Sequence, residues 1–278
     1  MANFTGNGSK SLHTSVNASL KKLQTDYIDL VRCSPIPVHV FVVDPWQLYV
    51  HWWDFSCTIP ELMQSLNHLV AAGKVLYLGI SDTPAWVVSK ANEYARNHGL
   101  RPFSVYQGRW SAATRDFERD IMPMARDEGM ALAPWGSLGG GNFKTEEQRR
   151  AAGGRAVKPS EDQIKMGAVL ETVAKRHNTI ITSVALAYVM HKAPYVFPIV
   201  GGRTIDHLKQ NVDALQLVLS DADIDEIEAA VPFDPGFPNT FFYGDKKPAH
   251  HQHVWLLGMA GTFDYVPETR PIAPVRGE

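Results

Sequence analysis

The sequence has few cysteines, little net charge and no long apolar run. Its two cysteines, Cys33 and Cys57, exclude a disulfide scaffold and a cysteine-based zinc site. Lys and Arg number 27 and Asp and Glu 29, and a net charge of −2 is too small to attract nucleic acid or an anionic membrane. No segment approaches the roughly 20 apolar residues of a membrane span, and the first residues lack the order of a secretory signal. We expect a cytoplasmic globular protein with no nucleic-acid or membrane partner.

From about residue 15, short β-rich apolar runs alternate with amphipathic segments, a pattern typical of βα units around a parallel sheet. Strands are expected at a run ending near His51 and over 75–80, 103–107, 130–134 and 196–200. Helices are expected over 12–23, 58–73, 83–99, 116–128, 160–177 and 183–191, and after Thr204. Thr58, Ser160 and Thr204 are expected to cap their helices, and Gly73 suits the left-handed position at a helix end. The last regular helix is expected after Ser220, and an irregular tail follows Val231. Residues 137–160 are expected to form a long loop. Five strands are fewer than the eight of an α/β barrel.

The residues that follow the expected strands are polar, aromatic or glycine. In a parallel α/β fold these ends meet at one edge of the sheet, where ligands bind. Ser81, Asp82 and Gln107 offer groups for holding an amide, Trp135 offers a stacking face, and the glycine-rich loops let backbone N–H groups approach phosphates. Together they indicate a nucleotide pocket, although each has a plainer reading as loop, core or surface residue.

Several segments resemble the aldo-keto reductase superfamily, most closely its fungal aryl-alcohol dehydrogenase and norsolorinic acid reductase branch. They include YVHWWD at 49–54, GKVLYLGISDTPAWV at 73–87, RDFERDIMPMARDEGMALA at 115–133 and FPIVGGRTIDHLKQN at 197–211. The resemblance implies an (α/β)8 barrel of the TIM type, incomplete here, over residues 1–238, with a tail at 239–278. It also implies an enzyme that uses NADP(H) to interconvert small aromatic aldehydes or ketones and their alcohols.

The resemblance also assigns roles by position. His51 matches the histidine that orients the substrate carbonyl, and Ser81, Asp82 and Gln107 match the residues that hold the nicotinamide carboxamide. Trp135 matches the aromatic residue that stacks on the nicotinamide, and Gly136, Leu138 and Gly140 line the pyrophosphate path. The adenosine-phosphate segment comprises Gly201, Gly202, Arg203, His207, Gln210 and Asn211, with Arg203 as the main 2′-phosphate ligand. Trp52, Trp53 and Trp110 are expected in an aromatic substrate pocket, and no metal is expected.

Two departures from the family pattern bear on activity. The family's catalytic Asp, Tyr and Lys lie on early strands that would precede Met1, so an N-terminal truncation is expected and Tyr49 is the nearest alternative proton donor. Residues 31–47 form an insert that places three prolines within an expected central strand, as an unspliced intron would. The alternatives to an active reductase are therefore a catalytically defective NADPH-binding or regulatory remnant, and a product that does not fold stably.

Overall fold

The computed structural model describes residues 6–33, 47–150, 159–202, 204–244, 253–262, 264 and 269–272. It contains a sheet of five strands in the order β1 (Ile28–Cys33), β2 (Gln47–His51), β3 (Val75–Ser81), β4 (Phe103–Arg109) and β5 (Ala131–Trp135). The chain divides into two compact units. Unit 1 comprises residues 1–108 and 120–133, and unit 2 comprises residues 109–119 and 134–278. The predicted division at residue 238 stays a prediction.

Strands β1 and β2 pair with successive parts of β3: β1 pairs with residues 75–78 and β2 with residues 79–81. Val31 of β1 pairs with Leu78, and Tyr49 of β2 pairs with Gly79, the next residue of β3. Leu78 and Gly79 are consecutive residues of β3, but their partners Val31 and Tyr49 are 18 positions apart in the sequence (49 − 31). The chain therefore has 17 extra residues between two positions that would be consecutive in a single strand beside β3. The register therefore gives the same length as the insert at 31–47, which also counts 17 residues.

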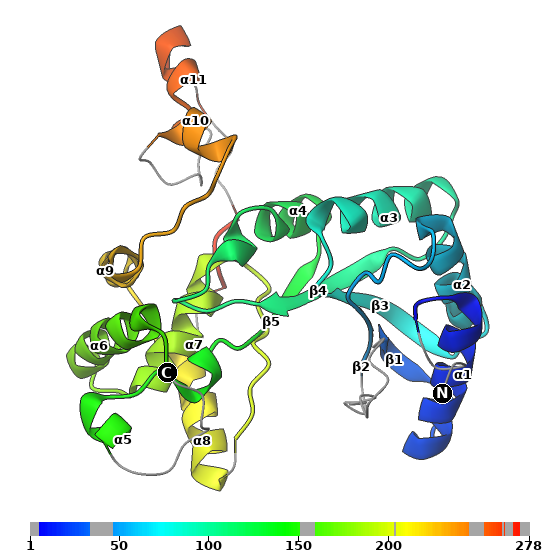
Figure 1. The fold of residues 1–278 in the computed structure, drawn as a ribbon, viewed down its shortest axis with the longest axis horizontal. Helices are drawn as coiled ribbons and strands as arrows, with labels where there is room; N and C mark the ends of the chain where they lie inside the picture. The colour runs from blue at the N-terminus through cyan, green and yellow to red at the C-terminus, as the bar shows by residue number, and fades with distance from the viewer. Residues whose placement is uncertain are drawn as a thin grey trace. The chain divides into compact units, whose positions relative to one another are not determined.

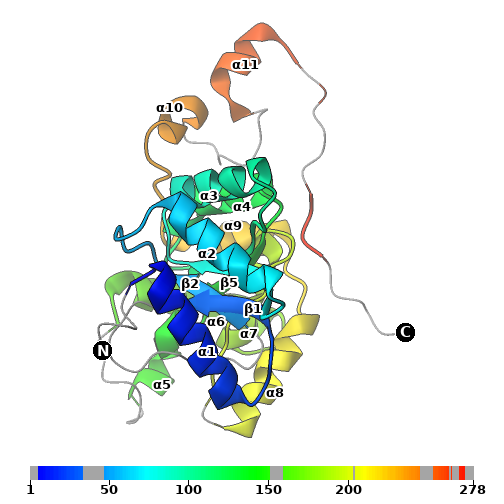
Figure 2. The same ribbon diagram turned by 90° about the vertical axis from the view of Figure 1, so that its right-hand side faces the viewer.

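Four helices lie on one face of the sheet in unit 1 (Figures 1 and 2): α1 (Ser9–Leu23), α2 (Ile59–Ala71), α3 (Ala85–Asn97) and α4 (Ile121–Asp127). The cap residues expected from the sequence are in place for α2, where the Thr58 hydroxyl accepts from the Glu61 N–H at 3.3 Å and Gly73 adopts φ +68° after the helix. Val50, Leu78 and Ile80 are fully buried. The side of the sheet that these residues line therefore forms the core of unit 1.

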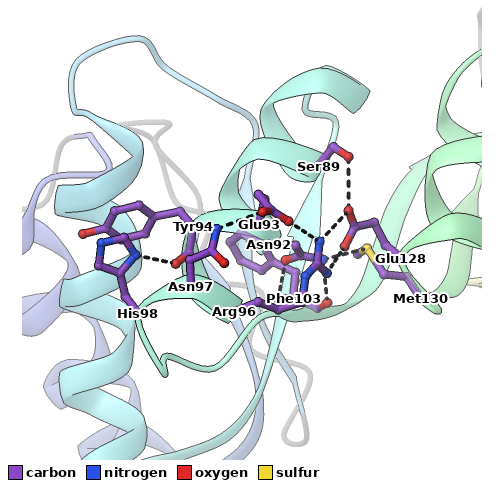
Figure 3. A network of polar contacts seen from close by, with 10 residues as sticks. All are labelled: Ser89, Asn92, Glu93, Tyr94, Arg96, Asn97, His98, Phe103, Glu128 and Met130. Atoms are coloured by element: carbon purple, nitrogen blue, oxygen red, sulfur yellow. Dashed lines mark hydrogen bonds and ion pairs between the residues drawn. The ribbon is translucent and has the colours of Figure 1, made fainter.

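A polar network fastens α3 to the ends of β4 and α4 (Figure 3). Asn92, which is buried, accepts from the Phe103 N–H at 2.8 Å and donates to the Phe103 carbonyl at 3.2 Å. Arg96 donates to both oxygens of Glu128, at 2.6 and 3.3 Å, and Ser89 donates to the same carboxylate at 3.1 Å. This network holds the first residue of β4 in place. Because β4 is a single strand, the position of Gln107 near its other end is held as well.

Unit 2 is mainly helical. Its elements are η2 (Asp116–Glu118), η3 (Gly139–Gly141), α5 (Glu146–Arg150), α6 (Glu161–Arg176), α7 (Ile181–Lys192), α8 (Ile205–Asp213), η4 (Ala214–Gln216), α9 (Asp221–Ala230), α10 (Asn239–Tyr243) and α11 (Trp255–Ala260). Ser160 and Ser220 form capping boxes at the starts of α6 and α9, and the Thr204 hydroxyl caps α8, as the sequence predicts.

A buried charge cluster joins α7, α9 and η2. It consists of Arg115, Glu118, Lys192 and Glu228. Arg115 contacts Glu118 at 2.8 Å and Glu228 at 3.3 Å, and Lys192 contacts Glu118 at 3.2 Å and also Glu228. Burial by itself would raise the pKa of Glu118, but hydrogen bonding from Arg115 and the charges of Lys192 and Arg115 outweigh it and hold that pKa below its ordinary value.

A second buried carboxylate, Asp223, lies at the start of α9. Burial opposes its ionisation, but hydrogen bonds from the side chain and backbone of Ser220, from His177 and from Arg176 hold the pKa of Asp223 well below its ordinary value. The His177 ring nitrogen is 2.9 Å from the carboxylate. The ionised form of Asp223 therefore stabilises the junction of α6 and α9.

Four sequence predictions are corrected here. The expected strand at 196–200 has only single bridge positions, at Val196 and at Ile199, which pairs with Trp135, because Pro198 lacks an N–H group to continue a ladder. The expected helix at 116–128 is divided into η2 and α4. The expected loop at 137–160 contains η3 and α5, and the tail after residue 231 contains α10 and α11. The last three misses concern elements of three to seven residues, which are too short to show a clear hydrophobic period.

Candidate active site

The ends of three neighbouring strands in unit 1 bring His51, Ser81 and Gln107 into one row. His51 pairs with Ser81 across β2 and β3, and Ser81 pairs with Gln107 across β3 and β4. Because residues at paired positions point to the same face of a sheet, the three side chains share a face. Val50 and Ile80 are buried on the other face of the sheet. Tyr77 lies on the same face as Ser81, and it is 54% exposed.

Hydrogen bonds connect these side chains. His51 Nε2 is 3.3 Å from Gln107 Oε1. The Ser81 hydroxyl lies 2.9 Å from Asp82 Oδ2 and 3.3 Å from Gln107 Oε1, and it can donate to either. Ser81 and Gln107 are buried, whereas His51 is partly exposed and Asp82 is exposed. His51 and Asp82 are therefore accessible to a ligand, and the buried Ser81 and Gln107 lie beside them.

The backbone at this edge adopts conformations that few residues tolerate. Asp82 has φ +46°, in the left-handed region where Asp and Asn are the most frequent residues after glycine. Trp52 has φ +54°, which costs a bulky residue on the order of 1–3 kcal/mol. The Trp52 N–H donates to the Ser81 carbonyl at 2.6 Å and the Asp82 N–H to the Gln107 carbonyl at 3.0 Å. The two turns are thus fastened to the neighbouring strands.

The buried side chain of Tyr106 fixes the turn after β3 through two hydrogen bonds to its backbone. Its hydroxyl accepts from the Thr83 N–H at 3.0 Å and donates to the Thr83 carbonyl at 2.7 Å. Burial raises the pKa of Tyr106 well above its ordinary value, against the effect of the Thr83 hydrogen bond. This buried, doubly hydrogen-bonded phenol therefore supports the backbone of the turn.

In unit 2, a second group of predicted residues follows β5. Trp135 is 39% exposed, and the Arg109 guanidinium carbon lies 6.0 Å from the centre of its ring. Gly136 has φ +76°, and the Ser137 hydroxyl donates to the Trp110 carbonyl at 3.1 Å. Leu138 is partly exposed and Gly140 is exposed. These residues form an open turn with accessible backbone at Gly140, as a phosphate path requires.

The segment around α8 carries the third predicted group. Gly201, Gly202, His207 and Gln210 are exposed and Asn211 is partly exposed, while Arg203 lies outside the described residues. A Cβ atom at Gly202 would lie 2.8 Å from His207 Cβ, so the turn into α8 requires glycine there. The bridge from Ile199 to Trp135 places the approach to this turn beside the end of β5.

The three predicted pocket tryptophans differ in placement. Trp52 is 46% exposed, and Trp53 is partly exposed with its ring 6.3 Å from that of Phe55. Trp110 is fully buried, stacks on Phe117 at 5.1 Å and donates its indole N–H to Glu118 at 3.0 Å. Trp110 therefore packs within unit 2 in the described structure, and its contact with substrate stays a prediction.

Two residues near these groups have no counterpart in the sequence analysis. Arg109 lies over Trp135, and Asn7 is hydrogen-bonded to the turn after β2. Arg109 stands two residues after the end of the predicted strand at 103–107, so its position was a detectable signal. Asn7 lies more than 40 residues from its partners, and no local pattern marks it.

Comparison with known proteins agrees with this arrangement. The profile of the aldo/keto reductase family matches residues 3–232. The chain belongs to this family. It is 53% identical to norsolorinic acid reductase B of Dothistroma septosporum, over 98% of the chain and 68% of the relative. It is 51% identical to an aryl-alcohol dehydrogenase of Pestalotiopsis microspora, over 100% and 68%, and 50% identical to a probable aryl-alcohol dehydrogenase of Saccharomyces cerevisiae, over 95% and 78%.

The fold agrees with the same assignment. A crystal structure of a thermostable aldo-keto reductase in complex with the inhibitor epalrestat superposes with a TM-score of 0.61 at 23% identity, covering 80% of this chain and 67% of that one. The predicted α/β fold class of the TIM-barrel type is confirmed. This aldo/keto reductase is thus an oxidoreductase of a family that typically uses NAD(P)H.

None of the helices in the described part of the chain is long and apolar enough to cross a membrane. Within the same ranges, no group of three or more His, Cys, Asp and Glu side chains is arranged to hold a metal ion.

Proposed function

We propose that this aldo/keto reductase is an NADP(H)-dependent enzyme that interconverts aromatic aldehydes or ketones and their alcohols. The observation that carries the proposal is the hydrogen-bonded group of His51, Ser81 and Gln107 at the ends of adjacent parallel strands, with Asp82 beside it. The names of the similar proteins, norsolorinic acid reductase and aryl-alcohol dehydrogenase, support an aromatic carbonyl substrate.

The chemistry of this group fits a carboxamide. A nicotinamide carboxamide has two N–H donors and one carbonyl acceptor. The Gln107 side chain and the Ser81 hydroxyl can each donate and accept, whereas an ionised Asp82 can only accept. Asp82 therefore suits the amide N–H groups, and the carboxamide oxygen requires a donor from Gln107 or Ser81. When bound, the nicotinamide supplies the hydride for reduction of the carbonyl.

His51 is the residue proposed to touch the substrate. Its ring is partly exposed, and Nε2 lies at hydrogen-bond distance from Gln107. A donated imidazole N–H can orient a carbonyl oxygen and stabilise the negative charge that develops there during reduction. Trp52 and Trp53, which follow His51 directly, supply the exposed aromatic surface for an aryl group.

The remaining predicted residues are proposed to bind the rest of the cofactor. Trp135 offers a face for stacking, and the backbone of Gly136, Leu138 and Gly140 suits the pyrophosphate. Recognition of the adenosine phosphate is proposed for the segment from Gly201 to Asn211. A preference for NADP over NAD rests on Arg203, because a guanidinium binds a phosphate through two parallel hydrogen bonds.

Binding of NADPH can be measured by quenching of tryptophan fluorescence in the full chain. We expect saturable quenching that is reduced in Trp135→Phe. Gln107→Ala should raise the Kd about tenfold, since a lost buried hydrogen bond costs roughly 1–1.5 kcal/mol. Gln64→Ala is the matched control, because Gln64 is an exposed residue of α2 that contacts Tyr94. Absence of saturable quenching, or equal Kd values for Gln107→Ala and Gln64→Ala, would contradict the proposal.

Turnover separates the enzyme from the alternative function. Consumption of NADPH with an aromatic aldehyde and formation of the alcohol support the reductase. Saturable NADPH binding without turnover supports a catalytically defective NADPH-binding or regulatory protein.

A further inference from the structure

The turn that follows His51 is held by a residue from the N-terminal part of unit 1, more than 40 residues earlier in the sequence. Asn7 is 2% exposed, and its side-chain N–H donates to the Trp52 carbonyl at 3.0 Å. Its backbone N–H donates to Asp54 Oδ2 at 2.7 Å, and the other oxygen of Asp54 accepts from the Ser56 N–H at 2.9 Å. The residues before α1 thus fasten the loop after β2.

These bonds act on the least favourable backbone conformation at the site. Trp52 has φ +54°, and a bulky aromatic residue leaves the left-handed region unless its surroundings hold it there. The Trp52 N–H is held by the Ser81 carbonyl at 2.6 Å, and the Trp52 carbonyl is held by Asn7. Without the donor from Asn7, the peptide group between Trp52 and the next residue is free to rotate.

A rotation of the backbone at Trp52 also displaces the backbone of His51, because a peptide bond joins the two residues. The His51 ring lies 3.3 Å from Gln107 Oε1, close to the upper limit for a hydrogen bond, so a displacement of a few tenths of an ångström breaks the contact. We propose that Asn7 is a positioning residue that fixes the ring of His51 through the backbone of Trp52. This inference rests on the proposed role of His51.

The neighbouring residues of the same segment do not share this role. Ser9 contacts Glu61 and Ser65 of α2, with 2.6 Å between the Ser9 and Ser65 hydroxyl oxygens. Ser9→Ala therefore removes an anchor of the same segment without touching the turn after His51. It is the matched control for substitutions of Asn7.

The test observes the His51 ring itself. The full chain is labelled with ¹⁵N in its histidine rings, and the two nitrogen signals of His51 are assigned from the spectrum of His51→Gln. We expect Asn7→Ala to shift both signals toward those of Gln107→Ala, whereas Ser9→Ala leaves them in place. Trp52→Gly supplies the rescue, because glycine adopts φ +54° without strain. In the Trp52→Gly background, Asn7→Ala should shift the His51 signals by less than half as much.

Unchanged His51 signals in Asn7→Ala, equal shifts in Ser9→Ala, or a full shift in the Trp52→Gly background would each overturn the proposal. If Asn7→Ala does not fold, Asn7→Asp replaces it, since aspartate keeps the volume but cannot donate. In turnover assays, Asn7→Ala should lower kcat on the order of 10- to 100-fold and leave the Kd for NADPH within about twofold. The NMR result does not depend on turnover, so a chain that fails to reduce aldehydes contradicts the proposed function and leaves this inference open to its own test.

Discussion

Deleting residues 31–47 should leave the sheet of unit 1 intact. The deletion joins Leu30 to Leu48, and Leu48 then takes the place opposite Leu78 that Val31 occupies in the intact chain. Every position from Tyr49 to His51 keeps its observed partner in β3. Two strands that now act in series become one continuous strand.

The stability change can be worked from the closure of the loop. Joining two consecutive positions beside β3 through 17 extra residues costs about 2.5 kcal/mol of chain entropy, from (3/2)RT ln 17. Deletion also removes the β1–β2 pairs Leu30–Gln47, Val31–Leu48 and Cys33–Val50, a loss of about 0.5–1 kcal/mol for each pair. The free energy of unfolding should therefore be unchanged to within about 1 kcal/mol.

The matched control is a deletion one residue shorter, of residues 31–46. It shifts the register by one and turns every later side chain of the strand to the other face. Val50, which is fully buried opposite Ile80, then moves to the open face and loses roughly 1.5–3 kcal/mol of burial. His51 moves toward the apolar core, which adds about 1–3 kcal/mol. The control should be less stable than the 31–47 deletion by about 2.5–6 kcal/mol.

Urea unfolding followed by tryptophan fluorescence and circular dichroism gives both free energies. Equal stability of the two deletions would refute the register argument. So would a 31–47 deletion that is less stable than the shorter one.

Four further predictions concern the rest of the chain. Glu228→Ala leaves the cations of the buried charge cluster incompletely paired and should lower the free energy of unfolding by about 3–5 kcal/mol in urea titrations; a loss below about 1 kcal/mol would show that the cluster is not desolvated. Asn92→Ala strands the N–H and carbonyl of Phe103 and should cost about 2–4 kcal/mol, whereas an exposed asparagine would cost almost nothing. Because folding lowers the pKa of Asp223, its contribution is complete above its unfolded pKa of about 3.9 and is lost as the pH falls below that value; Asp223→Asn should flatten this part of the curve of stability against pH. The transcript should include a form shorter by 51 nucleotides (3 × 17) at codons 31–47, since valine codons begin with GT and one glutamine codon ends in AG; cDNA sequencing that finds only the long form would contradict excision.

Much of the fold could be predicted because its signals are local. Thr58, Ser160 and Thr204 are predicted as caps from the hydroxyl and the helical period after each, and all three cap helices. The helix predicted after Ser220 is also present, with Ser220 as its cap. The strand at 196–200 was predicted from its apolar run, but Pro198 and the positive φ of Tyr195 prevent a ladder. Strand pairing depends on the neighbour as well as on the segment, which a run of apolar residues does not reveal.

The site was predictable at the strand ends and not beyond them. Ser81 and Gln107 follow directly from the rule that parallel strands deliver their last residues to one edge, and the register confirms that they are neighbours. The bond from Asn7 to Trp52 joins residues 45 apart in sequence. It also depends on a positive φ at a tryptophan, which no propensity predicts. Such contacts become visible only in three dimensions.

Turnover is the measurement that tests the proposed function most directly. The full chain is mixed with NADPH and an aromatic aldehyde, and the loss of NADPH absorbance is compared with formation of the alcohol. Our account predicts equal amounts of NADPH consumed and alcohol formed, with a rate reduced on the order of 100-fold or more in His51→Gln, as for the removal of a group that stabilises developing charge. NADPH consumption that is absent, or that is equal in His51→Gln, would contradict it.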